Sequence, residues 1–351
     1  MRVRRDGVDG TVAWLGALCF LLSTVEFMIP KPLPFLRLGL ANLPVMLAID
    51  VLPFPSWLLL ICIKILGQGL VSGTLFSYTC LFSAAGSLTS AFAMLGLKRL
   101  FRDRISFVGL SAAGAFASNG AQLALARLWI FGEGALYIAP PFLAVGLITG
   151  TLLGAFTNAF VAKSRWYVDL RAGILNVPSP QFNPDGTAPG TEIRKPGLIP
   201  SIPALRLSIG FILLAALLFP NSLVVRAVAA TIGLALLLSD SSKIRPVPTI
   251  AVPAGIVLFS LLVPFGRVLA SPFGFPITEG ALILGIKKAL SIEGMVFVSR
   301  WMLRSGLILP GRAGKILADS LGILKTLTER RRDFKATDPI GSIDRLMRGP
   351  D

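Results

Sequence analysis

The chain has 351 residues, of which 54% are hydrophobic and 15% are charged, and its formal net charge is +16. Soluble domains are usually about 45–50% apolar and about 25% charged, so this composition indicates a lipid bilayer as the solvent for much of the chain. The absence of histidine excludes His-based catalytic triads and histidine metal sites. The three cysteines lie inside apolar runs and form no paired metal signature, so no cofactor is expected.

The first 165 residues contain six apolar runs. They cover about 11–30, 43–53, 56–72, 77–97, 105–131 and 138–162. The second run is short for a straight crossing, so we expect it to be tilted or packed inside the protein. Basic clusters at 2–5, 98–104 and 163–165 mark the cytoplasmic ends of the runs if the N-terminus is cytoplasmic. The sequence therefore predicts an all-α integral membrane protein that begins with a six-helix bundle over residues 1–165.

The remaining residues divide into four further segments by composition. Residues 166–200 are rich in proline and glycine and predict a polar cytoplasmic linker. Residues 201–300 predict a second membrane block of about four helices, the last of which runs from 277 to 299 and returns to the cytoplasm. Residues 301–327 have the spacing of an amphipathic helix on the inner surface, and 328–351 predict a loose polar tail.

Several polar side chains interrupt the apolar runs of the first block, where an ionisable group is costly. Lys64 lies in the middle of the third run, and Gln68 follows one helical turn later, on the same face. Asn119 and Gln122 share a face of the fifth run. Glu26 lies near the outer end of the first run, and Arg37 and Asn42 lie in the loop that follows it. These residues map to the outer half or the middle of the predicted bundle.

Two interpretations of this polar set stay open. In the first, Lys64 and Arg37, with Arg127 further along, face an anionic substrate in a pocket that opens outward, and Asn42, Gln68, Asn119 and Gln122 complete it. In the second, Lys64 pairs with Glu26 to hold helices together, and the amides serve as interhelical hydrogen bonds. Arg37 and Arg127 also have the length to reach lipid headgroups.

Small residues form a second pattern. Ala13 and Ala17 lie four residues apart in the first run, and Gly146, Gly150 and Gly154 form a ridge in the sixth. Such ridges allow helix backbones to approach closely, either within one chain or between subunits. The segment 311–316 contains Gly and Lys but lacks the spacing and the Ser/Thr of a phosphate loop, so we expect no ATPase or other enzymatic activity in this chain.

The first block resembles a known family through several ordered motifs. These are 30–34 (PKPLP), 37–42 (RLGLAN), 83–87 (SAAGS), 119–122 (NGAQ) and 146–150 (GLITG), together with Glu26 and Lys64. They are similar to the Gx transporter family, also labelled heptaprenyl diphosphate synthase component I. That family is in turn similar to the substrate-binding (S) components of energy-coupling factor (ECF) transporters. The likeness covers about 10–165, with Ser118 at a position where the family pattern has histidine.

The resemblance implies a function and a set of partners. It implies a substrate-binding subunit of an importer for a small, anionic vitamin, cofactor or precursor, in the cytoplasmic membrane of a bacterium. Ala13 and Ala17 resemble the motif by which S components dock the transmembrane coupling (T) subunit, and ATPase subunits of the ABC type would supply energy. Residues 201–300 resemble, more distantly, the T subunit itself. The alternative, from the synthase label, is a non-catalytic membrane partner in isoprenoid or quinone synthesis.

Overall fold

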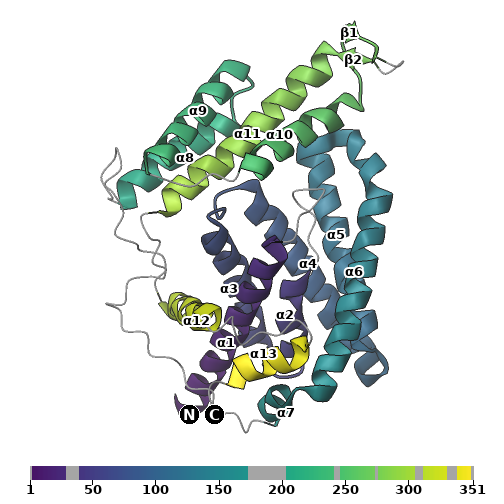
Figure 1. Cartoon of the computed structure of the whole chain (residues 1–351), viewed down its shortest axis with the longest axis vertical. Coiled ribbons are helices and arrows are strands. Elements are labelled where there is room, and N and C mark those ends of the chain that lie inside the picture. Colours follow the sequence, from purple (N-terminus) through teal and green to yellow (C-terminus); the bar gives the residue numbers. More distant parts are fainter. Residues whose placement is uncertain are drawn as a thin grey trace.

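The computed structural model of the chain describes residues 2–28, 39–172, 203–240, 246–272, 276–304, 311–329 and 338–348. The described residues are almost entirely helical, with one short hairpin of two strands. Figure 1 shows the helices of the first block in the lower and right parts of the view, with α8–α11 across the upper end. Helices α12 and α13 return to the end where the N-terminus lies.

The first block contains six helical segments up to Lys163. They are α1 (Arg2–Met28), α2 (Leu43–Ala48), α3 (Phe54–Ser72), α4 (Tyr78–Phe101), α5 (Phe107–Ala126) and α6 (Ala135–Lys163). Four stretches are long and apolar enough to cross a membrane, namely Gly7–Glu26, Phe54–Ser72, Tyr78–Phe101 and Phe107–Lys163. The 57-residue stretch contains both α5 and α6, which reverse direction at Gly132, where φ is 55°. These helices define a multi-pass membrane protein.

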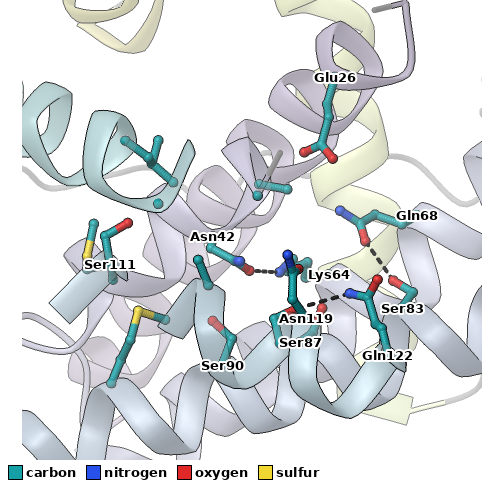
Figure 2. Close-up of a pocket in the computed structure, with 18 residues that line it drawn as sticks. Glu26, Asn42, Lys64, Gln68, Ser83, Ser87, Ser90, Ser111, Asn119 and Gln122 are labelled. Atoms are coloured by element: carbon teal, nitrogen blue, oxygen red, sulfur yellow. Dashed lines mark hydrogen bonds between the residues drawn. The ribbon is translucent and has the colours of Figure 1, made fainter. Parts of the chain in front are cut away.

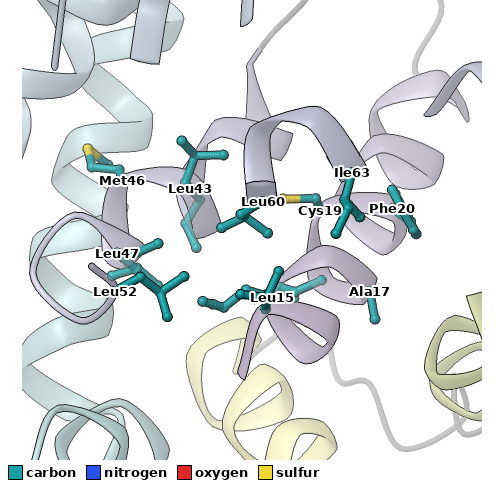
Figure 3. Close-up of a cluster of buried hydrophobic side chains, with 14 of the residues drawn as sticks. Leu15, Ala17, Cys19, Phe20, Leu43, Met46, Leu47, Leu52, Leu60 and Ile63 are labelled. Carbon is teal, nitrogen blue, oxygen red and sulfur yellow. The ribbon is translucent and has the colours of Figure 1, made fainter. Parts of the chain in front are cut away.

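The second expected span is not a full crossing. Helix α2 has six residues, all buried, which gives a length of about 9 Å at 1.5 Å per residue. Asn42 precedes it beside Lys64, and Asp50 follows it beside Lys98, the residue with which it forms an ion pair at 3.3 Å. The segment therefore runs inside the bundle from the level of Lys64, in the middle of α3, to the C-terminal end of α4. Figure 3 shows Leu43 of this segment packed near Leu15 of α1 and Leu60 of α3.

Helices α5 and α6 pack as an antiparallel pair along the glycine ridge. A Cβ built on Gly154 would lie 2.5 Å from the Cα of Val108, and one on Gly150 would lie 3.1 Å from the carbonyl oxygen of Ser111. At Gly146 the same atom would meet the side chain of Asn119. The ridge therefore packs helices of one chain against each other, which is one of the two roles expected from the sequence.

The second block contains four helices, as expected in outline. They are α8 (Pro203–Leu218), α9 (Leu223–Ser239), α10 (Pro246–Leu261) and α11 (Glu279–Leu303), with the strands β1 (Val268–Ala270) and β2 (Ile277–Thr278) between the last two. Helix α11 packs against the other three, and its Gly294 fits against Leu217 and Ala230. A buried ion pair between Arg206 and Asp240, at 2.6 Å, fastens the start of α8 to the end of α9.

The packing of α11 contradicts the path expected for 277–299. Its Ser299 accepts a hydrogen bond from the amide of Phe76 and donates one to the carbonyl oxygen of Gly73, both at 3.0 Å. These residues form the α3–α4 turn, which lies at the same end of the bundle as the α5–α6 turn because α4 and α5 alternate in direction. The α5–α6 end in turn packs against α10, where Phe131 contacts Phe259. Helix α11 therefore lies across this end of the bundle, as Figure 1 shows, and does not return to the opposite end.

Two C-terminal helices pack on the first block. Helix α12 (Gly311–Glu329) begins later than the expected amphipathic segment, because α11 continues to Leu303. It packs along α1, where Arg312 forms an ion pair with Asp9. Helix α13 (Pro339–Arg348) lies in the stretch expected to be loose, and its Asp344 accepts hydrogen bonds from the hydroxyl of Ser164 at 2.6 Å and the amide of Trp166 at 2.9 Å. The expectation of a loose tail is therefore wrong for 339–348.

We expect Gly154→Ala to destabilise the protein, because the new methyl group would meet the backbone of α5 and neither helix can move a backbone cheaply. Overpacking of this kind costs about 1–3 kcal/mol. The matched control is Gly120→Ala, on α5, where a Cβ would meet nothing within 4 Å. Thermal unfolding in detergent should show a lower midpoint for the first variant and an unchanged or higher one for the second. Equal midpoints would contradict the close contact.

Candidate functional site

Helix α3 carries the one lysine of the candidate site into the centre of the first block. Lys64 is 3% exposed and Gln68 is 8% exposed, and both lie on one face because they are separated by one turn. The ammonium group of Lys64 donates a hydrogen bond to the side-chain oxygen of Asn42. Asn42 ends a short 3₁₀ turn, Leu40–Asn42, that starts from Gly39 in the left-handed conformation, with φ of 83°. The turn thus brings an amide oxygen to the buried cation.

Helices α4 and α5 supply the opposite wall. The side-chain oxygen of Gln68 accepts a hydrogen bond from Ser83 at 3.1 Å, and the amide nitrogen of Gln122 donates to Ser118, also at 3.1 Å. Asn119 donates to the carbonyl oxygen of Phe142 in α6 at 3.1 Å, which fixes its orientation. Figure 2 shows Lys64, Gln68, Gln122 and Asn42 grouped around one space, with the hydrogen bonds from Lys64 to Asn42 and from Ser83 to Gln68 dashed.

The grouped residues line a cavity. Its lining includes the polar residues Glu26, Asn42, Lys64, Gln68, Ser83, Ser87, Ser90, Ser111, Ser118, Asn119 and Gln122. The free space is about 30 Å³, enough for about two water molecules. In this conformation the polar side chains therefore fill most of the site themselves, and a larger molecule would have to displace some of them.

Two buried polar atoms in this lining have no hydrogen-bond partner among the described residues. They are the side-chain oxygen of Gln122, whose residue is 1% exposed, and the hydroxyl of Ser90, also 1% exposed. Leaving a buried polar group without a partner costs about 1–3 kcal/mol. A molecule that donates a hydrogen bond to Gln122 would recover that cost.

Glu26 also lines the cavity, at the end of α1, and is 6% exposed. Its carboxylate accepts a hydrogen bond from the amide of Leu40 at 3.1 Å. Glu26 and Lys64 therefore hold two successive parts of the same turn, Leu40 and Asn42. Figure 2 shows Glu26 above the group formed by Lys64 and Gln68.

The structure brings together five of the six residues predicted to bind substrate. These are Asn42, Lys64, Gln68, Asn119 and Gln122, and all of them line the cavity. Arg37 lies outside the described residues. Arg127 does not line the cavity. Its side chain is exposed and forms an ion pair with Glu133 at 2.8 Å. Substrate binding by these residues stays a prediction.

Serine residues are the part of the lining that was missed. Ser83, Ser87 and Ser90 follow one another along one face of α4, at the i, i+4, i+7 spacing, and all are buried. Ser111 and Ser118 lie two turns apart on α5 and face them across the cavity. The spacing was visible in the sequence, but serine is common in membrane helices, where its hydroxyl bonds the preceding turn.

The predicted docking face on α1 has an occupant within the chain. Ala13 and Ala17 are 1% and 0% exposed, and they belong to the same buried cluster as Ile316 of α12. Between them, a Cβ on Gly16 would lie 2.7 Å from the hydroxyl of Ser320. A separate subunit could therefore reach this part of α1 only after α12 had left it.

Two families match the chain over separate ranges. Residues 15–160 match the family described as heptaprenyl diphosphate synthase component I, which confirms the resemblance to that family expected for the first block. Residues 202–305 match a second family, described as a domain of unknown function. No curated protein and no solved structure matches the chain. The match of the first block gives no positive evidence of catalysis in this chain.

We expect Lys64→Met to fold normally, because Lys64 and Glu26 have different hydrogen-bond partners and a methionine side chain fills nearly the same space. The double variant with Glu26→Gln should show a small coupling in thermal unfolding, about 0.5–1 kcal/mol, because both residues hold the turn from Leu40 to Asn42. If the two residues instead formed a structural ion pair, Lys64→Met alone would cost about 3–5 kcal/mol and Glu26→Gln would restore stability. Thermal-shift measurements on the two single variants and the double variant decide between these outcomes.

Proposed function

We propose that this chain is the substrate-binding membrane subunit of an importer of the ECF type, which takes up a small, anionic vitamin, cofactor or precursor and relies on separate ATPase subunits. The observation that carries the proposal is a buried lysine among amides and hydroxyls in an otherwise apolar bundle. A lysine at the centre of a membrane helix costs about 2.5–3.5 kcal/mol on insertion scales. An anionic group bound beside Lys64 would offset that cost and would explain why a lysine occupies this position.

The direction of entry follows from the position of the turn over the cavity. Glu26, Gly39 and Asn42 line the side of the cavity nearest the end of α1. With the N-terminus in the cytoplasm, this end faces outward, and Arg37 lies only five residues before Asn42 in the sequence. We infer that substrate enters between these residues, meets Arg37 first and is then held by Lys64.

The small free volume is consistent with a closed form of such a subunit. Opening the turn from Leu40 to Asn42 would release the amide oxygen of Asn42 from Lys64 and expose the cation to a ligand. The unpartnered oxygen of Gln122 would then accept a hydrogen bond from the ligand. The ligand class that fits has one acidic group and at least one N–H or O–H donor.

The second block and α12 bear on the coupling partner. In this proposal α8–α11 serve as a T-like module, and α12 fills in cis the face on α1 that a separate T subunit would otherwise use. ATPase subunits of the ABC type would act from the cytoplasmic side on α12, which lies along the N-terminal half of α1, because α8–α11 cross the opposite, outward end of the bundle. Surrounding lipid remains the other partner of the exposed apolar helices.

The second candidate function is a non-catalytic membrane partner in isoprenoid or quinone synthesis. The description of the family matched by residues 15–160 favours it. Under this alternative the chain would bind a cytoplasmic synthase subunit, and the polar cavity would hold only water. The two functions therefore differ in whether a small molecule accompanies the purified chain.

We expect native mass spectrometry of the full chain, purified in mild detergent, to show one bound small molecule that is lost in Lys64→Met. The control is Arg127→Gln, which removes an exposed cation outside the cavity and should retain the molecule. Co-purification of a synthase subunit with no small molecule, in both the wild type and Lys64→Met, would favour the alternative and contradict the importer.

A further inference from the structure

A second, roomier cavity lies at the end of the first block opposite to Glu26 and the turn from Leu40 to Asn42. It is formed where the α2–α3 turn meets the last turn of α4, and its volume is about 220 Å³. Its lining combines three charged side chains, Asp50, Lys98 and Arg99, with the aromatic side chains Phe54 and Trp57. None of these residues lines the cavity around Lys64.

The charged side of this cavity is positive. Lys98 forms an ion pair with Asp50 at 3.3 Å, so the charges of these two side chains balance. The guanidinium of Arg99 is the second cation in the lining and makes its net charge positive. Arg99 is exposed, has no carboxylate partner among the described residues, and lies 5.6 Å over the ring of Phe54. With two cations and one carboxylate, the lining favours an anion. Arg104, exposed in the following turn, adds to the positive potential.

The apolar side continues from the cavity onto the outer surface of the bundle. Trp57 is 1% exposed, and its indole N–H is satisfied by the carbonyl oxygen of Val45 at 3.1 Å. Its ring packs between Phe54, 44% exposed, and Phe92, 47% exposed, with centroid distances of 6.0 and 6.2 Å. The three aromatic rings thus form a continuous strip, in which the two outer rings are exposed on the surface of the protein.

The strip runs in the direction of the membrane interior. Phe92 precedes Arg99 by seven residues, so both lie on one face of α4, and about 10 Å of helix separates them. A cation at the end of a membrane helix lies at headgroup level, and a residue about 10 Å further along the helix lies among the acyl chains. The site therefore has a positive head and an aromatic path beneath it.

We propose that the cavity between Asp50, Lys98 and Arg99 binds the headgroup of an anionic phospholipid, with an acyl chain along Phe54 and Phe92. The phosphate would accept hydrogen bonds from Arg99 and Lys98. The pairing of Asp50 with Lys98 keeps the lysine oriented toward the cavity. Basic pockets between membrane helices on the cytoplasmic side bind such lipids in general. This inference does not depend on the importer function.

The test uses the delipidated full chain in detergent and native mass spectrometry, with phosphatidylglycerol, phosphatidylethanolamine and phosphatidylcholine added separately at equal concentrations. We expect one phosphatidylglycerol to bind more tightly than either zwitterionic lipid. Arg99→Gln should weaken phosphatidylglycerol binding about fivefold, the effect of removing one cation at the membrane surface. Arg99→Lys should retain most of the preference.

The matched control is Lys163→Gln, which removes an exposed cation in the last turn of α6 without touching the cavity. It should bind phosphatidylglycerol as the wild type does. Because Arg99 is exposed, both variants should keep the wild-type unfolding midpoint. If Arg99→Gln does not fold, Phe54→Leu, which removes the ring beneath the guanidinium, is expected to weaken the same preference. Equal binding of all three lipids, or a preference unchanged in the variant, would overturn the proposal.

Discussion

The structure of the first block depends on the cost of placing one lysine at the centre of an apolar helix bundle. Lys64 is 3% exposed, and buried amides and hydroxyls surround it. Asn42 bonds the ammonium group directly, and Gln68 and Gln122 are fastened to serines of the neighbouring helices. A buried polar network stabilises a fold only when its members find partners, since each unmet group is costly in a low dielectric. A ligand would therefore stabilise the network most by forming hydrogen bonds with the side-chain oxygen of Gln122 and the hydroxyl of Ser90.

Close helix contact makes this network possible. Gly146 of α6 gives Asn119 the space to reach the carbonyl oxygen of Phe142, since a larger residue there would collide with the amide. The same ridge continues through Gly150 and Gly154, so that α5 and α6 remain in contact over most of their length. On the other side of the block, α12 supports α1, which carries Glu26 at its far end. The position of the cavity thus depends on the close packing of α5 and α6, which their glycine residues allow.

Hydropathy and charge predicted the helical membrane fold and most of the long helices, because the choice between lipid and water depends on composition over about 20 residues. The residues of the cavity could be predicted for a similar reason, since amides and a lysine are costly in lipid and tend to share one interior. The serines of α4 could not be separated from serines that merely bond their own helix. Arg127 was grouped with the site by depth alone, and its actual partner, Glu133, lies six residues away in the next turn.

The errors in the second half of the chain arise from contacts between distant segments. Hydropathy shows that 277–299 is mostly apolar, but the direction of α11 depends on Ser299 meeting the α3–α4 turn, more than 220 residues away in sequence. Helix α13 was missed because it is short and its charged residues dominate the composition of the tail. Its apolar residues Ile340, Ile343 and Met347 nevertheless have helical spacing, and they pack on the first block. Such helices become visible only when the surface that covers them is known.

The central claim is that the cavity around Lys64 is a ligand site and not a structural polar cluster. Electron cryomicroscopy of the full chain in lipid nanodiscs, purified without washing out small molecules, tests this claim most directly. If the cavity binds a ligand, we expect density larger than water between Lys64, Gln68 and Gln122, with Asn42 moved away from the ammonium group. A map in which these side chains contact one another as they do here, with space for water alone, would contradict it.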